Sequence, residues 1–235
     1  MIRAALVMAL IVLSGAAHAN CRQALALALD VSGSVDAREY RLQLGGVAQA
    51  LDAPEVREKL LAMPGAPVRL MIFEWSGPAD QAVLVPWTVI ADQAAIDIVI
   101  DTLRQTARRP ATPGTALGTA MTLGAHYLDQ QSDCWKMTLD ISGDGKSNLG
   151  PRPREVKPML EDRDITINAL VIGADNPNTG DVRQAEIGEL SSYFNAEVIL
   201  GADAFVLTAI GFADYARAMK QKLLRELEGL VLSRL

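Results

Sequence analysis

Short apolar segments alternate with amphipathic segments along most of this chain. The first apolar segment, residues 24–29, ends abruptly at Asp30, which is typical of a buried parallel strand that leads into a loop. After Asp36, a residue type that often caps helices, apolar residues recur at helical spacing as far as Leu51. This alternation predicts an α/β fold with a largely parallel sheet and helices on both of its faces.

The remaining segments continue the pattern. Residues 68–75 and 81–90 are β-prone and are joined by a Ser-Gly-Pro-Ala turn, which predicts a hairpin. We therefore expect a doubly wound, mostly parallel sheet in which one strand of this hairpin is antiparallel. Further strands are expected at 135–142, 165–172 and 197–200, and further helices at 91–108, 115–128, 155–163, 182–193 and from 212 onward. The polar side of that last helix should carry Lys220, Lys222, Arg225 and Glu226.

The N-terminal sequence predicts export. Arg3 precedes an apolar run that extends to Leu13, and small residues follow as far as Ala19, which are the three parts of a secretory signal peptide. A membrane anchor is the alternative, but the run is shorter than the roughly 20 residues that a spanning helix needs. We expect residues 1–19 to be a cleaved signal peptide and residues 20–235 to form one domain without a membrane span, periplasmic or secreted.

Composition limits the classes of function. Half of the residues are hydrophobic and 21% are charged, so the chain should fold. The net charge of -6 argues against sequence-independent binding of nucleic acid, because such binding requires clustered Lys and Arg. A protein or a small ligand is the expected kind of partner.

Three polar clusters fall where predicted strands end or a predicted helix begins. In an open α/β sheet, the functional crevice lies beyond the carboxyl ends of the strands. Taken alone, each cluster is explained by helix capping or by turn formation, with Ser34 and Thr115 as natural caps. Together they supply two carboxylates and three hydroxyls, which suit a hard cation such as Mg²⁺ or Mn²⁺. The clusters are residues 30–34, 114–118 and 142–145.

At these residues the chain resembles the von Willebrand factor type A family. The family's metal-ion-dependent adhesion site reads D-x-S-x-S, then a Thr in a Gly-Thr loop, then an Asp before Gly. The resemblance covers nearly the whole mature chain and implies the same doubly wound, mostly parallel sheet with one antiparallel edge strand. It also implies that the three hydroxyls coordinate the metal directly and that a partner protein fills an open coordination position with an Asp or Glu. The matching residues are Asp30, Ser32, Ser34, Thr115 and Asp144.

A closer similarity is to an uncharacterised secreted bacterial branch of this family. It is carried by residues 30–35, 74–77 (Glu-Trp-Ser-Gly), 85–88 (Val-Pro-Trp-Thr), 140–145 (Asp-Ile-Ser-Gly-Asp-Gly) and 201–205 (Gly-Ala-Asp-Ala-Phe). One departure from the common family pattern is Gly143, where Thr often precedes the metal-site Asp. That departure bears on the affinity for the metal more than on its presence.

Two further acidic residues lie in predicted strands. Asp140 falls in the middle of a strand, where an unpaired carboxylate is costly to bury. We therefore expect it to pair with a basic residue, such as a nearby Arg, rather than to serve the site. Glu74 ends a strand next to the first one, and an acid that supports the metal from a distance is the less favoured role for it.

A metal-dependent phosphatase or other hydrolase is the alternative function. A phosphatase of the haloacid dehalogenase type needs a second Asp two residues after the first, and Ser32 stands there. A serine hydrolase needs a base, but His126 is expected on the solvated side of its helix, and the chain has no G-x-S-x-G motif. We therefore expect a non-catalytic, metal-dependent protein-binding module. A structural domain with a vestigial metal site is the third possibility.

Cys21 and Cys134 are expected to form a disulfide, because disulfides persist outside the cytoplasm. Cys21 precedes Asp30 by nine residues, and Cys134 precedes Asp144 by ten. Both cysteines should therefore lie at similar depth near the bottom of their strands. With the usual sheet order of the family, these strands are neighbours. Two separate thiols are the alternative.

Overall fold

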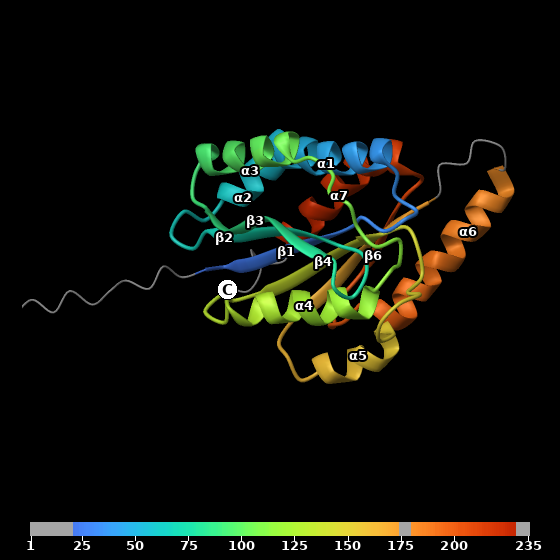
Figure 1. The fold of residues 1–235 in the computed structure, drawn as a ribbon. Helices are drawn as coiled ribbons and strands as arrows, with labels where there is room; N and C mark the ends of the chain where they lie inside the picture. The colour runs from blue at the N-terminus through green and yellow to red at the C-terminus, as the bar shows by residue number, and fades with distance from the viewer. Residues whose placement is uncertain (1–20, 174–179, 229–235) are drawn as a thin grey trace, which may run out of the picture.

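A six-stranded sheet forms the middle of the domain (Figure 1). This computed structural model describes residues 21–173 and 180–228, so the expected signal peptide lies outside the described residues. The strand order is β3-β2-β1-β4-β5-β6, and each neighbouring pair is parallel except β2 with β3. The strands are β1 (Gln23–Asp30), β2 (Val68–Trp75), β3 (Gln81–Ile90), β4 (Met137–Gly143), β5 (Thr166–Ile172) and β6 (Val206–Ala209).

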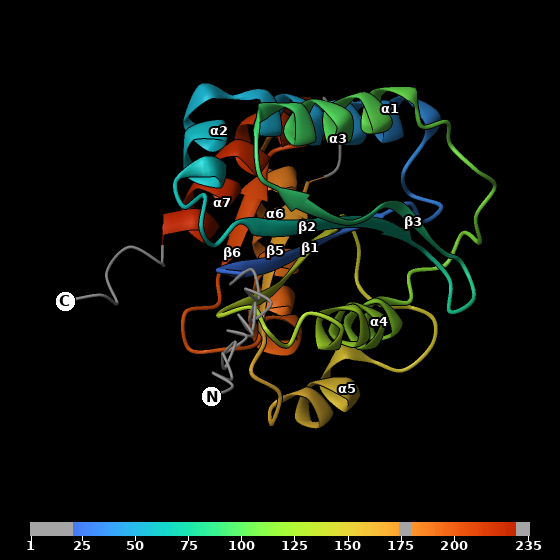
Figure 2. The same cartoon turned by 90° about the vertical axis from the view of Figure 1, so that its left-hand side faces the viewer.

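Helices cover both faces of the sheet (Figure 2). The doubly wound architecture and its antiparallel edge strand are thereby confirmed. Among the described residues, no helix is both long enough and apolar enough to cross a membrane. One face carries α1 (Ala37–Asp52), α2 (Pro54–Leu61), α3 (Gln93–Gln105) and α7 (Tyr215–Glu228), the other carries α4 (Leu117–Asp129) and α5 (Pro153–Leu160), and α6 (Gly180–Tyr193) contacts β5 and β6.

β1 is buried on both faces, as its continuous apolar run predicts. Its leucines point into the core layer that includes α1 and α7, and its alanines point toward α4. The small alanines leave room for a close approach of α4. Gly124 adds to this, because a Cβ at Gly124 would lie only 2.5 Å from Leu139 of β4. Helix α4, which begins just after the candidate site residue Thr115, therefore packs tightly on the central strands.

The prediction of a strand at residues 197–200 is wrong. Residues Phe194–Val198 form a π-helical turn that continues α6, and the sixth strand is β6, further along the chain. Phe194 and Val198 are both buried in the core on the α4 side, which holds this turn in a helical form. Leu200 forms only an isolated antiparallel bridge with Ile167. Helix α2 was not predicted at all, although Pro54 marks its first turn.

The polar side predicted for the last helix is wrong for two residues. Lys222 and Glu226 of α7 are buried and face Asp140 of β4. The Lys222 Nζ atom lies 2.7 Å from Asp140 Oδ1 and donates to Glu226 Oε1 at 2.7 Å. Asn168 Nδ2 of β5 donates to the same Glu226 oxygen at 2.9 Å. Asp140 is thus paired, as expected, but with a lysine from α7, and the network fixes α7 against β4 and β5.

The network places two carboxylates against one ammonium group. Burial, and next the Glu226 carboxylate, raise the pKa of Asp140 to about 7, although Lys222 lowers it in part. Between pH 3.8 and about 7, Asp140 therefore stays protonated in the folded state, whereas it loses its proton in the unfolded state. Stability should accordingly fall as the pH rises from 3.8, the ordinary pKa of the group, to about 7.

Asp140→Asn should remove this contribution to the pH dependence. The free energy of unfolding would be measured by urea denaturation between pH 5 and pH 7 for the wild type and the variant. The wild-type value should decline relative to the variant by at most about 1.4 kcal/mol per pH unit, the limit for one proton. Asp52→Asn, which changes an exposed carboxylate, is the control. A wild-type-minus-variant difference that does not depend on pH would contradict the assignment.

A disulfide joins Cys21 to Cys134 at the lower ends of β1 and β4. The S–S distance is 2.01 Å, and the two residues form an isolated parallel bridge. Ala24 pairs with Met137, so each cysteine precedes that pair by three residues. The pairing agrees with the prediction from spacing, and it fixes the lower end of the same two strands whose upper ends carry aspartates.

Loss of the disulfide should destabilise the fold strongly. The bond closes a loop with a sequence separation of 113 residues, for which the chain-entropy model gives about 4.7 kcal/mol. The double variant Cys21→Ser/Cys134→Ser should lose a comparable free energy of unfolding in chemical denaturation. Protein recovered from an oxidising compartment and denatured without reductant should show no reactive thiol. Two titratable thiols in that sample would contradict the pairing.

Candidate metal centre

The three polar clusters of the sequence meet at the carboxyl edge of the sheet. Leu29 of β1 pairs with Ser142 of β4, so the next residues, Asp30 and Gly143, reach the edge side by side. The start of α4 is tied to the same edge, because Ala116 N donates to Ser76 O, just beyond β2, at 2.7 Å. Parallel topology therefore brings the clusters together although they are far apart in sequence.

Four of the five predicted site residues form one continuous chain of hydrogen bonds. Ser32 N donates to Asp30 Oδ1 at 2.8 Å. The hydroxyls of Ser32 and Ser34 lie 3.1 Å apart, and Ser34 Oγ donates to Asp144 Oδ1 at 2.7 Å. The loop after β1 is thus linked by its side chains to the loop after β4.

Thr115 lies next to this chain of contacts. Its backbone N–H donates to Asn148 Oδ1 at 2.8 Å, and its carbonyl accepts from Asn148 N at 2.9 Å. A Cβ at Gly145 would lie 4.0 Å from Thr115 Oγ1. The hydroxyl therefore borders the loop that carries Asp144. Asn148, which the sequence analysis did not single out, holds this arrangement by pairing with both backbone groups of Thr115.

Helix capping does not explain the positions of the Ser34 and Thr115 hydroxyls. Asp36 is the N-cap of α1, and its side chain accepts from Arg38 N and Glu39 N. The N-cap of α4 is Ala116, which has no side-chain cap. Neither Ser34 nor Thr115 caps a helix, so their placement at this edge needs another explanation.

The two aspartates form a poorly solvated acidic pair. Asp30 is fully buried, and its Oδ2 atom has no hydrogen-bond partner among the described residues. Burial, and next the Asp144 carboxylate, raise the pKa of Asp30 to about 7, although hydrogen bonds from Ser32 offset this in part. Burial also raises the pKa of Asp144. A cation at this edge would relieve the repulsion and give the orphaned oxygen a partner.

The donor set fits a hard divalent cation. It consists of hydroxyl and carboxylate oxygens, which are the ligands that Mg²⁺ and Mn²⁺ prefer. In residues 21–173 and 180–228, no group of three or more His, Cys, Asp or Glu side chains is placed to hold a metal. The candidate centre therefore depends on its three hydroxyls as well as on its two carboxylates.

Two aromatic rings lie near Gly143, where the common family pattern often has Thr. A Cβ at Gly143 would lie 3.3 Å from Phe194 Cζ, 3.4 Å from Asp30 Oδ2 and 3.8 Å from Trp75 Cζ2. A side chain there would therefore require the Phe194 ring to shift slightly. Trp75 ends β2 inside the Glu-Trp-Ser-Gly segment and pairs with Asp30 in the register of β1 and β2.

Glu74 and His126 have other surroundings. Glu74 accepts from the Tyr40 hydroxyl at 3.1 Å and from Arg109 Nε at 2.9 Å. Tyr40 belongs to the core on the α1 side, so these contacts hold Glu74 on the face opposite α4. His126 is exposed on α4, as its position on the helix predicted.

The fold is that of von Willebrand factor type A domains. The chain matches the von Willebrand factor type A protein from Catenulispora acidiphila with a TM-score of 0.59 and 14% identity, over 88% of this chain and 43% of that one. It matches mussel proximal thread matrix protein 1, in a form with a zinc-occupied MIDAS motif, at 0.59 and 12%, over 89% and 46%. BatB from Bacteroides thetaiotaomicron matches at 0.55 and 13%, over 87% and 98%. The chain spans less than half of the first two proteins.

Within this class, the chain belongs to the family described as "Protein of unknown function (DUF1194)", whose model matches residues 20–231. No curated protein matches the chain. The resemblance to von Willebrand factor type A domains is thereby confirmed at the level of the fold. The case for the metal rests on the geometry of the five residues.

Gly118→Ala should disturb this centre through packing. A Cβ at Gly118 would lie 2.2 Å from the carbonyl oxygen of Pro151, so the first turn of α4 and the loop after β4 would have to separate. We expect a loss of about 1–3 kcal/mol in the free energy of unfolding, as for other overpacked sites.

Gly45→Ala is the matched control, because Gly45 lies in α1 and a Cβ there meets nothing within 4 Å. Alanine should stabilise that exposed helical position by up to about 1 kcal/mol. Equal stability of the two variants in chemical denaturation would contradict the close contact between α4 and the loop.

Proposed function

We propose that this protein is a periplasmic or secreted module that binds a partner protein through a divalent cation. The observation that carries the proposal is the hydrogen-bonded chain Asp30–Ser32–Ser34–Asp144, which begins at a buried carboxylate whose second oxygen has no hydrogen-bond partner among the described residues. The zinc-occupied MIDAS motif of the mussel protein supports a divalent cation in this fold. The disulfide is consistent with an oxidising compartment.

The five residues would share the work of holding Mg²⁺ or Mn²⁺. Ser32, Ser34 and Thr115 would supply neutral hydroxyl oxygens, and Asp30 and Asp144 would hold the cation directly or through water. A bound cation supplies an electrophile for an external carboxylate, because neutral hydroxyls leave much of its charge uncompensated.

The partner's carboxylate can reach this position from solvent. Ser34 and Gly33 are exposed, and Asp144 and Gly145 are half-buried, so the edge is open above the buried Asp30. An Asp or Glu of a partner protein would complete the coordination of the cation. A binding role is better supported than a hydrolase, since the exposed His126 on α4 is not joined to this hydrogen-bonded chain.

Metal titration tests this proposal. In verified apoprotein, Mg²⁺ or Mn²⁺ should raise the free energy of unfolding by about 2.7 kcal/mol at a hundred times the dissociation constant. Thr115→Ala should remove most of this gain while the domain stays folded. Thr122→Ala, which removes an exposed hydroxyl on the same helix α4, is the control and should keep the gain. Melting that is unchanged across the Mg²⁺ and Mn²⁺ series would show a vestigial site instead.

A further inference from the structure

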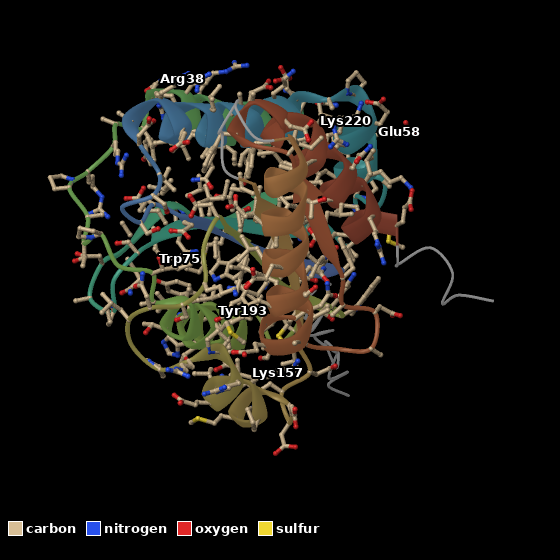
Figure 3. The ribbon with its side chains drawn as sticks, turned by 90° about the vertical axis from the view of Figure 1, so that its right-hand side faces the viewer. Arg38, Glu58, Trp75, Lys157, Tyr193 and Lys220 are labelled. Carbon is tan, nitrogen blue, oxygen red and sulfur yellow. A yellow bond between two sulfur atoms is a disulfide. The ribbon has the colours of Figure 1, made fainter. Side chains whose placement is uncertain are left out.

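Three arginines gather on one flank of the candidate metal centre. Arg41 lies near the start of α1, and Arg108 and Arg109 lie in the segment between α3 and Thr115. Arg41 and Arg109 are exposed, and Arg108 is half-buried. Figure 3 shows Arg38, in the first turn of α1, toward the same end of the molecule as Trp75. We call Arg41, Arg108 and Arg109 the arginine flank.

A buried tyrosine organises this flank. The guanidinium carbons of Arg41 and Arg108 lie 5.3 and 5.9 Å from the centroid of the Tyr40 ring, within the range of cation–π contacts. The Tyr40 hydroxyl donates to Glu74, whose other oxygen accepts from Arg109. All three arginines therefore contact one buried Tyr–Glu pair, which reduces the side-chain freedom that binding would remove.

The flank keeps unused positive charge. Arg109 is paired with the buried Glu74. Arg41 donates to the Arg104 carbonyl, and neither Arg41 nor Arg108 forms an ion pair with any residue in the described parts of the chain. The chain as a whole has a net charge of -6, whereas Arg41 and Arg108, on this side of the site, keep their positive charge without an ion pair to any described residue.

The flank is continuous with the metal centre. Gly33 N, between the two site serines, donates to Pro113 O at 2.9 Å, in the segment that carries Arg108 and Arg109. The other end of the flank, α1, begins at Ala37, directly after the same metal loop. A ligand that reaches the cation over the Ser32–Ser34 loop would therefore meet these guanidinium groups next.

We propose that the arginine flank binds a run of acidic side chains in the partner, next to the carboxylate that completes the metal site. The inference rests on the proposed function and narrows its partner to a protein segment rich in Asp and Glu. Guanidinium groups are suited to this role, because their planar forks bind carboxylates through paired hydrogen bonds. The negative remainder of the molecule would repel such a segment and direct it to this edge.

Two labelled octapeptides test the proposal with the full chain in saturating Mg²⁺. One consists of eight glutamates, and the other has one glutamate among glycines and serines. Eight equivalent carboxylates alone would give octaglutamate an advantage of up to about eightfold at the cation, and fluorescence anisotropy should show a further factor of about ten from arginine–carboxylate contacts. The double variant Arg41→Gln/Arg108→Gln should lose this further factor, while its affinity for the single-glutamate peptide and its stabilisation by Mg²⁺ stay unchanged.

The matched control is Arg163→Gln/Arg217→Gln, which removes two arginines paired with Asp129 and Asp214 outside the flank. It should keep the preference for octaglutamate. If the flank variant does not fold, Arg41→Gln alone tests the same point at an exposed position and should lose part of the preference.

Each contrary outcome has a distinct meaning. An advantage of octaglutamate that the number of its carboxylates alone explains would overturn the acidic partner and leave the metal-dependent function standing. Binding of neither peptide, despite stabilisation by Mg²⁺, would overturn both proposals. A further factor that survives the flank variant would place the acidic segment elsewhere on the surface. Oligothymidine that binds the flank as tightly as octaglutamate, with or without Mg²⁺, would assign the flank to nucleic acid and overturn the proposal.

Discussion

The parallel register of β1 against β4 is the constraint on which the rest of the structure depends. It places Asp30 level with Gly143 at the upper edge and Cys21 opposite Cys134 at the lower end. A shift of one residue would turn every side chain of β1 to the other face of the sheet and exchange its leucines with its alanines. The disulfide and the meeting of the candidate site residues are therefore two consequences of one alignment, and the covalent bond fixes that alignment from the end opposite the candidate site.

Two buried aspartates on these central strands are stabilised in different ways. Asp140 meets Lys222 from α7, so its compensating charge is part of the fold. Asp30 has no cationic partner among the described residues, and the charged group that raises its pKa is the acidic Asp144. Burial raises the pKa of both aspartates to about 7, but only Asp140 faces a lysine. A buried charge without compensation is expensive, which is a physical reason to expect a cation from outside at Asp30.

Much of this fold could be predicted from the sequence because its signals are local. The apolar run of β1, the hairpin and the cysteine spacing each reflect one strand or one turn. The D-x-S-x-S spacing likewise places Asp30, Ser32 and Ser34 on one loop. The structure joins them to Asp144, but whether they hold a metal stays a prediction. Local signals also led to the wrong strand at 197–200, where the burial of Phe194 and Val198 continues a helix instead.

What could not be predicted depends on partners from distant elements. Lys222 reads as part of a polar helix face, and only the presence of Asp140 opposite it makes its burial acceptable. Asn148 lies in a loop that the sequence marks only as rich in turn residues. In the structure it forms two hydrogen bonds with the backbone of Thr115. From the sequence alone, Gly143 is only a departure from the family pattern, because the rings of Phe194 and Trp75 that lie near it come from distant parts of the chain.

The distribution of charge also depends on residues from distant elements. A net charge of -6 describes the chain as acidic, yet the arginine flank would make one edge of the sheet positive. Asp30 and Asp144 would be ionised when they hold a divalent cation, so the cation and the two carboxylates would balance, and Arg41 and Arg108 would carry the excess positive charge. A molecule that is negative over most of its surface and positive at one edge orients an acidic partner before contact. Under the two proposals, the hydroxyl-rich centre would hold the cation and the buried Tyr40–Glu74 pair would position the arginines, so that both would act on the same partner.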